Sequence, residues 1–133
     1  MTKTFKELQE VDVMVGGLYQ KNPDLKQSKF GYAYKRFSDK NYVPIAKDFN
    51  EELGALRVQF ALEDKTTGEV LIDRMNPRGF KYTKQGLTEL MAEEKKLAEK
   101  YDAMDVEINP FLSKMIPEGL EDDQMEMLSG LVL

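Results

Sequence analysis

The feature that most constrains the fold is a row of apolar residues spaced like one face of a helix. Its members follow at intervals of 3, 4, 4, 3 and 4 positions: Tyr42, Ile45, Phe49, Leu53, Leu56 and Phe60. This spacing is typical of a helix that packs one stripe against a partner helix. Pro44 falls in the expected first turn, where its missing N–H costs nothing. We therefore predict a helix over residues 42–62 that acts as the scaffold of the fold.

Capping residues predict where three further helices begin. Each is a polar residue in front of an apolar row with helical spacing: Thr4, Asn22 and Thr83. Glu7 completes a capping box with Thr4, in which each residue satisfies an amide of the other. The second of these helices is expected over residues 23–38, because Pro is favoured in a first helical turn. A short additional helix is expected within residues 120–133.

Between the third and fourth helices the sequence changes from helical to alternating periodicity. Residues 69–73 and 80–82 have the pattern of short strands, and Asn, Gly and Pro mark the turns around them. This predicts an antiparallel β-hairpin, with Val106–Ile108 as a third strand. The expected fold class is α+β, a bundle of about four helices with a small antiparallel hairpin. Residues 1–133 are expected to form a single domain.

The composition excludes several classes of chemistry. The chain contains no Cys and no His. Disulfides, thiolate catalysis and Cys-based metal sites are therefore excluded, and the commonest general base is missing. The Ser–Lys pairs Ser28-Lys29 and Ser113-Lys114 are adjacent residues, which face different directions on a helix. We predict that the protein is not an enzyme and uses neither a cofactor nor a small-molecule substrate.

Two clusters of carboxylates remain as candidates for a metal site. The first lies within about one turn of the third helix and the second near the C-terminus: Asp48, Glu51 and Glu52, then Glu121, Asp122, Asp123 and Glu126. Carboxylates can hold Mg²⁺ without His. Because these acids fall on polar helix faces beside lysines, we expect solvated surfaces and no metal. A carboxylate–metal enzyme is the alternative.

Charge is distributed unevenly along the chain, although the net charge is only −5. Residues 21–47 carry seven basic and two acidic side chains, whereas residues 99–133 carry two basic and nine acidic ones. The basic region predicts a docking face formed by Lys29, Lys35 and Arg36. Aromatic residues alternate with these cations, a pattern also found on surfaces that bind single-stranded nucleic acid. An ordinary polar helix face is the third interpretation.

The C-terminal segment ends on apolar residues behind an acidic stretch. Residues 119–133 are therefore a candidate partner-docking segment, whose apolar anchors would be Leu128, Leu131, Val132 and Leu133. A tail of this kind covers the core of its own protein or docks on another chain. The sequence leaves both alternatives open.

The order of these signals resembles that of one group of proteins. The segments that carry the resemblance are LKQSKFGYAYKRF, IAKDFNEEL, TTGEVLID, FKYTKQGLTELMAEEKKL and VEINPF. They are similar to small uncharacterised proteins from the morphogenesis regions of tailed bacteriophages, over about residues 20–111. The resemblance implies a virion component or an assembly factor, and it brings no active site with it.

The function expected from these observations is non-enzymatic. We expect a structural or assembly protein that acts through contacts with a protein partner or with copies of itself. The alternative is a small binding module that modulates nucleic acid, or a host nucleic-acid enzyme, through its basic helix. No apolar run approaches the roughly 20 residues of a membrane span, and the N-terminus lacks the apolar core of a signal peptide. We therefore expect no membrane contact and a cytoplasmic location (host cytoplasm or virion if phage-encoded).

Overall fold

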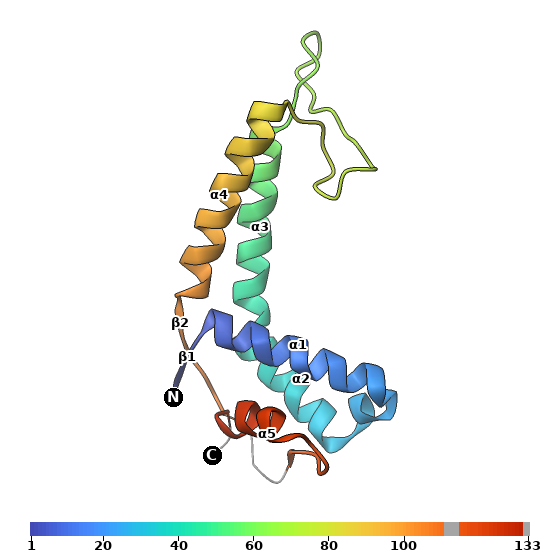
Figure 1. The fold of residues 1–133 in the computed structure, drawn as a ribbon, viewed down its shortest axis with the longest axis vertical. Helices are drawn as coiled ribbons and strands as arrows, with labels where there is room; N and C mark the ends of the chain where they lie inside the picture. The colour runs from blue at the N-terminus through green and yellow to red at the C-terminus, as the bar shows by residue number, and fades with distance from the viewer. Residues whose placement is uncertain (111–114, 132–133) are drawn as a thin grey trace. The chain divides into compact units, whose positions relative to one another are not determined.

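The computed structural model describes residues 1–110 and 115–131 of the chain. In chain order the elements are β1 (Thr2–Thr4), α1 (Phe5–Lys21), the 3₁₀ helix η1 (Pro23–Gln27), α2 (Lys29–Asn41), α3 (Val43–Phe60), α4 (Lys84–Asp102), β2 (Asp105–Glu107) and α5 (Asp122–Ser129) (Figure 1). The predicted class, mainly helical α+β, is confirmed. The single domain expected from the sequence stays a prediction, and within the chain two compact units can be distinguished. Unit 1 comprises Met1–Ala46 with Asp102–Leu133, and unit 2 comprises Lys47–Tyr101.

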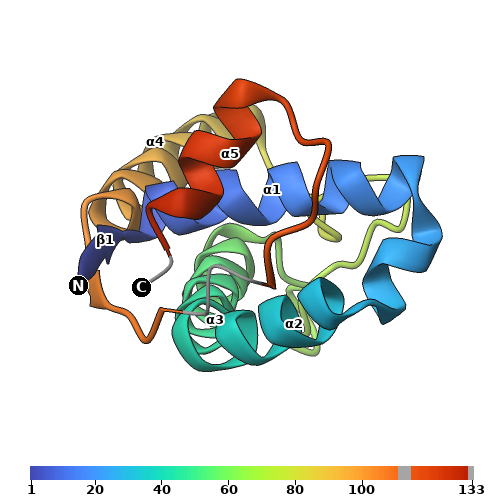
Figure 2. The ribbon, with the colours of Figure 1, turned by 90° about the horizontal axis from the view of Figure 1, so that it is seen from below.

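Unit 1 has an apolar core to which α1, α2, α5 and the β2 region all contribute. Its buried apolar side chains are Phe5, Leu8, Val11, Val15, Phe30, Tyr34, Phe37, Val106, Ile108, Leu128 and Leu131. On α1 these residues recur every three or four positions, which aligns them on one face of the helix. Figure 2 shows α5 lying against this helix. The C-terminal helix is therefore an integral part of unit 1.

Local capping at the N-terminus of α1 agrees with the prediction. The Thr4 backbone amide donates to Oε1 of Glu7, and the Glu7 amide donates to Oγ1 of Thr4, each at 3.2 Å. The hydrogen bond from the Thr4 amide holds the pKa of Glu7 below its ordinary value. Thr83 likewise accepts from the Gly86 amide at 2.9 Å in front of α4.

Strand pairing differs from the prediction. The strand expected at residues 106–108 is present as β2, but its antiparallel partner is β1 at the N-terminus, with Lys3 opposite Val106. The predicted hairpin over residues 69–82 has only isolated bridges, one of which joins Ile72 and Phe80. Polar side chains in this loop accept hydrogen bonds from nearby amides and form turns, which compete with a continuous ladder.

The second helix also begins later than predicted. Residues Pro23–Gln27 form η1, and α2 starts after Ser28, whose Oγ accepts from the Gly31 amide at 3.3 Å. Asn22 makes no side-chain capping bond. The helix then continues past residue 38, its predicted end, to Asn41.

Gly31 allows η1 and α2 to approach closely, and this predicts the effect of filling it. A Cβ at Gly31 would lie 2.6 Å from the carbonyl oxygen of Leu25, a backbone atom that cannot rotate away. We expect Gly31→Ala to lower the free energy of unfolding by about 1–3 kcal/mol, as overpacking does. At Gly16, in α1, a Cβ meets nothing within 4 Å, so Gly16→Ala is expected to stabilise by about 0.5–1 kcal/mol. Urea denaturation followed by circular dichroism tests both, and effects of the same sign would contradict the packing described.

In unit 2, α3 and α4 form an antiparallel pair (Figure 1). The rings of Phe49 and Tyr101 lie 5.1 Å apart near one end of the pair, and Arg57 contacts Glu94 nearer the other. The helix predicted over residues 42–62 is α3. None of its side chains is fully buried, however, and α4 buries only two. The helix pair therefore leaves its apolar rows half-covered.

Candidate interaction surfaces

The connection between α3 and α4 is long but ordered. It spans residues 61–83, whereas most connections in compact domains have about 4–6 residues, and longer ones commonly carry function. Backbone hydrogen bonds join its distant parts. The amide of Leu71 donates to the carbonyl of Leu62 at 2.8 Å, and that of Lys81 donates to the carbonyl of Leu71 at 3.0 Å. These bonds give the loop a stem, from which two turns extend.

The first turn is built around Asp64. Its carboxylate accepts hydrogen bonds from the amides of Thr66 and Thr67, at 2.8 and 3.1 Å. These bonds, the one from Thr66 first, hold the pKa of Asp64 below its ordinary value. The turn closes at Gly68, whose φ of 74° lies in the left-handed region that favours glycine.

The second turn is held by Asp73 and Asn76. Oδ1 of Asp73 accepts from the Met75 amide at 3.0 Å, and Oδ1 of Asn76 accepts from the Arg78 amide at 2.9 Å. The Asn76 amide group also donates to the carbonyl of Phe80 at 3.1 Å. Side-chain bonds of this kind fix a turn without strand pairing.

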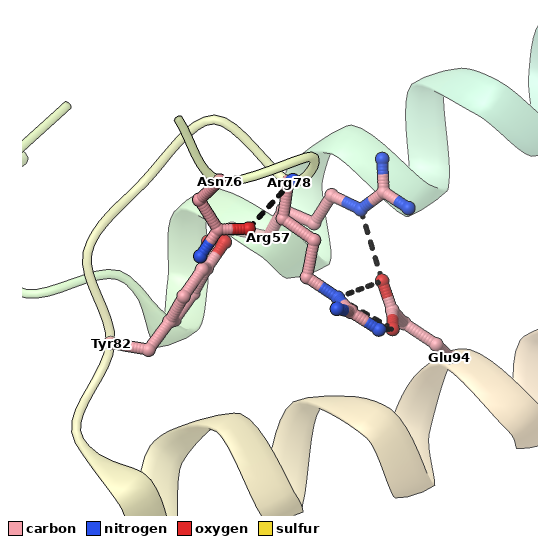
Figure 3. A network of polar contacts seen from close by, with 5 residues as sticks. All are labelled: Arg57, Asn76, Arg78, Tyr82 and Glu94. Carbon is pink, nitrogen blue, oxygen red and sulfur yellow. Dashed lines mark hydrogen bonds and ion pairs between the residues drawn. The ribbon is translucent and has the colours of Figure 1, made fainter. Parts of the chain in front are cut away.

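A cluster of two arginines and one glutamate fastens the second turn to the helix pair (Figure 3). Nε of Arg57, on α3, lies 3.0 Å from Oε2 of Glu94, on α4. Arg78, in the loop, donates from Nη2 and Nε to Oε1 of the same carboxylate at 2.8 and 3.1 Å. Tyr82 adds a bond from its hydroxyl to the Arg57 carbonyl at 3.0 Å. We call Arg57, Arg78 and Glu94 the arginine clamp.

The carboxylate of the clamp is shielded from water. The Glu94 side chain is 13% exposed, and both its oxygens accept hydrogen bonds. Burial acts to raise its pKa, but the hydrogen bonds from Arg78 and Arg57 outweigh burial and hold the pKa below the ordinary value of 4.5. The pKa of Arg78 is raised in return, mainly by its bond to Glu94. Both groups are therefore charged near neutral pH, and the cluster serves as a clamp rather than as an acid or a base.

The clamped turn presents apolar side chains to solvent. Met75 is 92% exposed and Ile72 is 65% exposed. We call these two residues the loop tip. The sequence does not reveal the loop tip, because the alternating pattern there is also typical of a hairpin. The available signal was a Met between two turn-forming residues, Asp73 and Asn76, inside an unusually long connection.

A second surface of unit 2 is a groove along α3 and α4, with a volume of about 390 Å³. It is lined by Glu52, Ala55, Leu56, Gln59, Glu93, Lys96, Leu97 and Lys100. Its centre is apolar and its rim carries both signs of charge. At one end, a hydrogen bond to the Glu52 carboxylate raises the pKa of the neighbouring Tyr101 to about 12. We call this surface the helix-pair groove.

The predicted basic face lies on α2. Lys29, Lys35 and Arg36 are all exposed. Lys35 forms an ion pair with Asp39 at 2.7 Å, whereas Lys29 and Arg36, two helical turns apart, share one face. Arg36 and Lys40 also border a pocket of about 240 Å³ in unit 1.

Most aromatic residues near these cations belong to the core. Phe30, Tyr34 and Phe37 are buried, and the Tyr34 hydroxyl donates to Asp12 at 2.7 Å. Burial and the bond to Asp12 raise the pKa of Tyr34 far above its ordinary value. Tyr32 is the large apolar side chain of α2 that stays exposed. The stacking platform suggested by the alternating pattern is therefore reduced to one ring.

The anchors predicted at the C-terminus have a different position. Leu128 and Leu131 are 0% and 1% exposed, in the core of unit 1. They are therefore not available to a partner. Of the two alternatives for the tail, these two residues fit the one in which it covers the core of its own protein. Val132 and Leu133 lie outside the described residues.

Within residues 1–110 and 115–131, no group of three or more His, Cys, Asp or Glu side chains is arranged to hold a metal ion. No helix in the same ranges has the length and apolar character needed to cross a bilayer.

The chain matches no protein-family model, no curated protein and no solved structure in the three comparisons made.

Proposed function

We propose that this chain is a non-enzymatic structural or assembly protein that acts by binding other protein surfaces, as a phage virion component or assembly factor would, in a host cytoplasm or a virion. The observation that carries this proposal is the loop tip. Met75 and Ile72 are exposed although they are apolar, and covering such side chains by a partner is favourable.

The arginine clamp makes the loop tip effective in binding. A partner that binds a disordered loop must also offset the entropy lost when the loop becomes ordered. Here the turn bonds and the clamp have already restricted the backbone around Met75. Methionine is also flexible enough to adapt to the surface that it meets. These properties support docking on protein.

The test is binding to purified phage capsid and tail proteins, measured by biolayer interferometry. We expect Met75→Asp to weaken binding at least about tenfold, because it places a charge in an apolar contact. Thr66→Asp is the matched control: it adds the same charge to the first turn, at an exposed side chain. A chain that binds none of these proteins would contradict the proposal.

Binding of nucleic acid through α2 is the second candidate. It is favoured by the shared exposed face of Lys29 and Arg36, and opposed by the burial of the neighbouring aromatic rings. Contacts to phosphate release counterions, so such binding weakens steeply with salt. Salt-dependent RNA or DNA binding that the double variant Lys29→Glu/Arg36→Glu loses, and Met75→Asp retains, would favour this candidate.

A further inference from the structure

The helix-pair groove has an internal symmetry. Its lining positions are 52, 55, 56 and 59 on α3, and 93, 96, 97 and 100 on α4. Each set is an i, i+3, i+4, i+7 series, which forms one face of a helix over two turns. The contacts of Phe49 with Tyr101 and of Arg57 with Glu94 place the midpoints of both series at about the same level of the antiparallel pair.

We infer that the occupant of this groove is the same groove of a second copy, in a two-fold symmetric dimer. An axis that crosses the helices at the midpoints packs α3 against α3 and α4 against α4, each pair antiparallel. Four helices then enclose one apolar seam, as in a four-helix bundle. The inference rests on the proposed function in that the partner is a protein, but it concerns a different surface from the loop tip.

The centre of the groove supplies the apolar contact. Leu56 and Leu97 are half-buried and lie beside the midpoints, so each would meet its own counterpart across the axis. Ala55 is exposed and small, which lets the two α3 helices approach closely. A second copy would cover the row that α3 and α4 together leave half-open.

The rim identifies a second copy as the partner that fits. Glu93 lies at one end of the α4 series and Lys100 at the other, and a two-fold axis places each opposite the other residue of the second copy. Self-complementary charge of this kind is what a symmetric interface requires. Lys96, nearer the axis, keeps Glu93 of its own helix as a partner at 3.2 Å. On α3 the same axis sets Glu52 opposite Gln59, an acceptor opposite an amide donor.

The experiment is a charge-swap series on the full chain, measured by sedimentation equilibrium. We expect the wild type to dimerise. Glu93→Lys and Lys100→Glu alone are each expected to weaken dimerisation at least about tenfold, because each sets like charges against one another. Mixing these two variants is expected to restore dimers that contain one copy of each, because every facing pair is then opposite in charge. Circular dichroism of each variant checks that the helices remain folded.

The controls are Lys95→Glu and Glu99→Lys, exposed positions of α4 that do not line the groove. They are expected to leave the dimer unchanged. A wild-type monomer at high concentration, equal effects of groove and control variants, or no recovery on mixing would each overturn the inference. A monomer that still binds a structural protein through Met75 leaves the proposed function standing, and a dimer that binds none leaves only this inference.

Discussion

Leu128→Ala is expected to lower the free energy of unfolding of unit 1 by about 2–5 kcal/mol, the range found when a buried leucine is truncated. The side chain is 0% exposed and lies on α5, which packs against α1. Truncation removes buried methyl groups and leaves a cavity. The surrounding helices are packed on both sides and cannot move in to fill it. Because small domains are stable by only about 5–15 kcal/mol, this is a large fraction of the total. Urea denaturation followed by circular dichroism measures it.

The matched control lies on the same helix. Met125 is 42% exposed, so Met125→Ala is expected to change stability by no more than about 0.5 kcal/mol. If Leu128→Ala instead unfolds like the wild type, α5 is not part of the core. The tail would then be free to act as the docking segment that the sequence also allowed.

The correct predictions come from signals that lie within one or two helical turns. The capping box of Thr4 and Glu7 involves residues three positions apart. The apolar residues of α3 recur every three or four positions. Both are determined by local geometry, so the sequence predicts them well. The pairing of β1 with β2 joins residues about a hundred positions apart. No local pattern in three-residue strands indicates such a partner.

The candidate surfaces show the same limit. Glu94 lies in a run of charged residues with Glu93, Lys95 and Lys96, and nothing in that run marks it as shielded. Glu94 is shielded only because Arg57, from α3, and Arg78, from the loop, both reach its carboxylate. Exposure of Lys29, by contrast, follows from its place on the polar face of one helix. For Leu128 the apolar character was evident, but what covers it depends on the tertiary fold.

Loss of the arginine clamp is expected to release the loop. Glu94→Ala removes the carboxylate from two partly shielded guanidinium groups, and hydrogen bonds to charged groups contribute about 1.5–3 kcal/mol each. The loop therefore opens at least about tenfold more often. Limited trypsin digestion measures this directly, because trypsin cleaves after Arg74 and Arg78. The control, Glu89→Ala on the same helix, removes only a 3.3 Å bond from Gln85 and should leave cleavage unchanged.

The clamp also predicts how the loop responds to pH. The pKa of Glu94 is lowered in the folded chain, so its contribution is complete above the ordinary value of 4.5 and is lost as the pH falls through the lowered pKa. Hydrogen exchange at the Met75 amide should show constant protection above about pH 5, once corrected for intrinsic rates, and a loss of protection in acid. Asp64 has a lowered pKa in the same loop, so the wild type alone does not assign the step. Glu94→Gln, which cannot titrate, should lack this step. An unchanged acid step in that variant would assign the transition to another carboxylate of the loop, in the first turn or beside the Met75 amide itself, and show that the clamp does not hold the second turn.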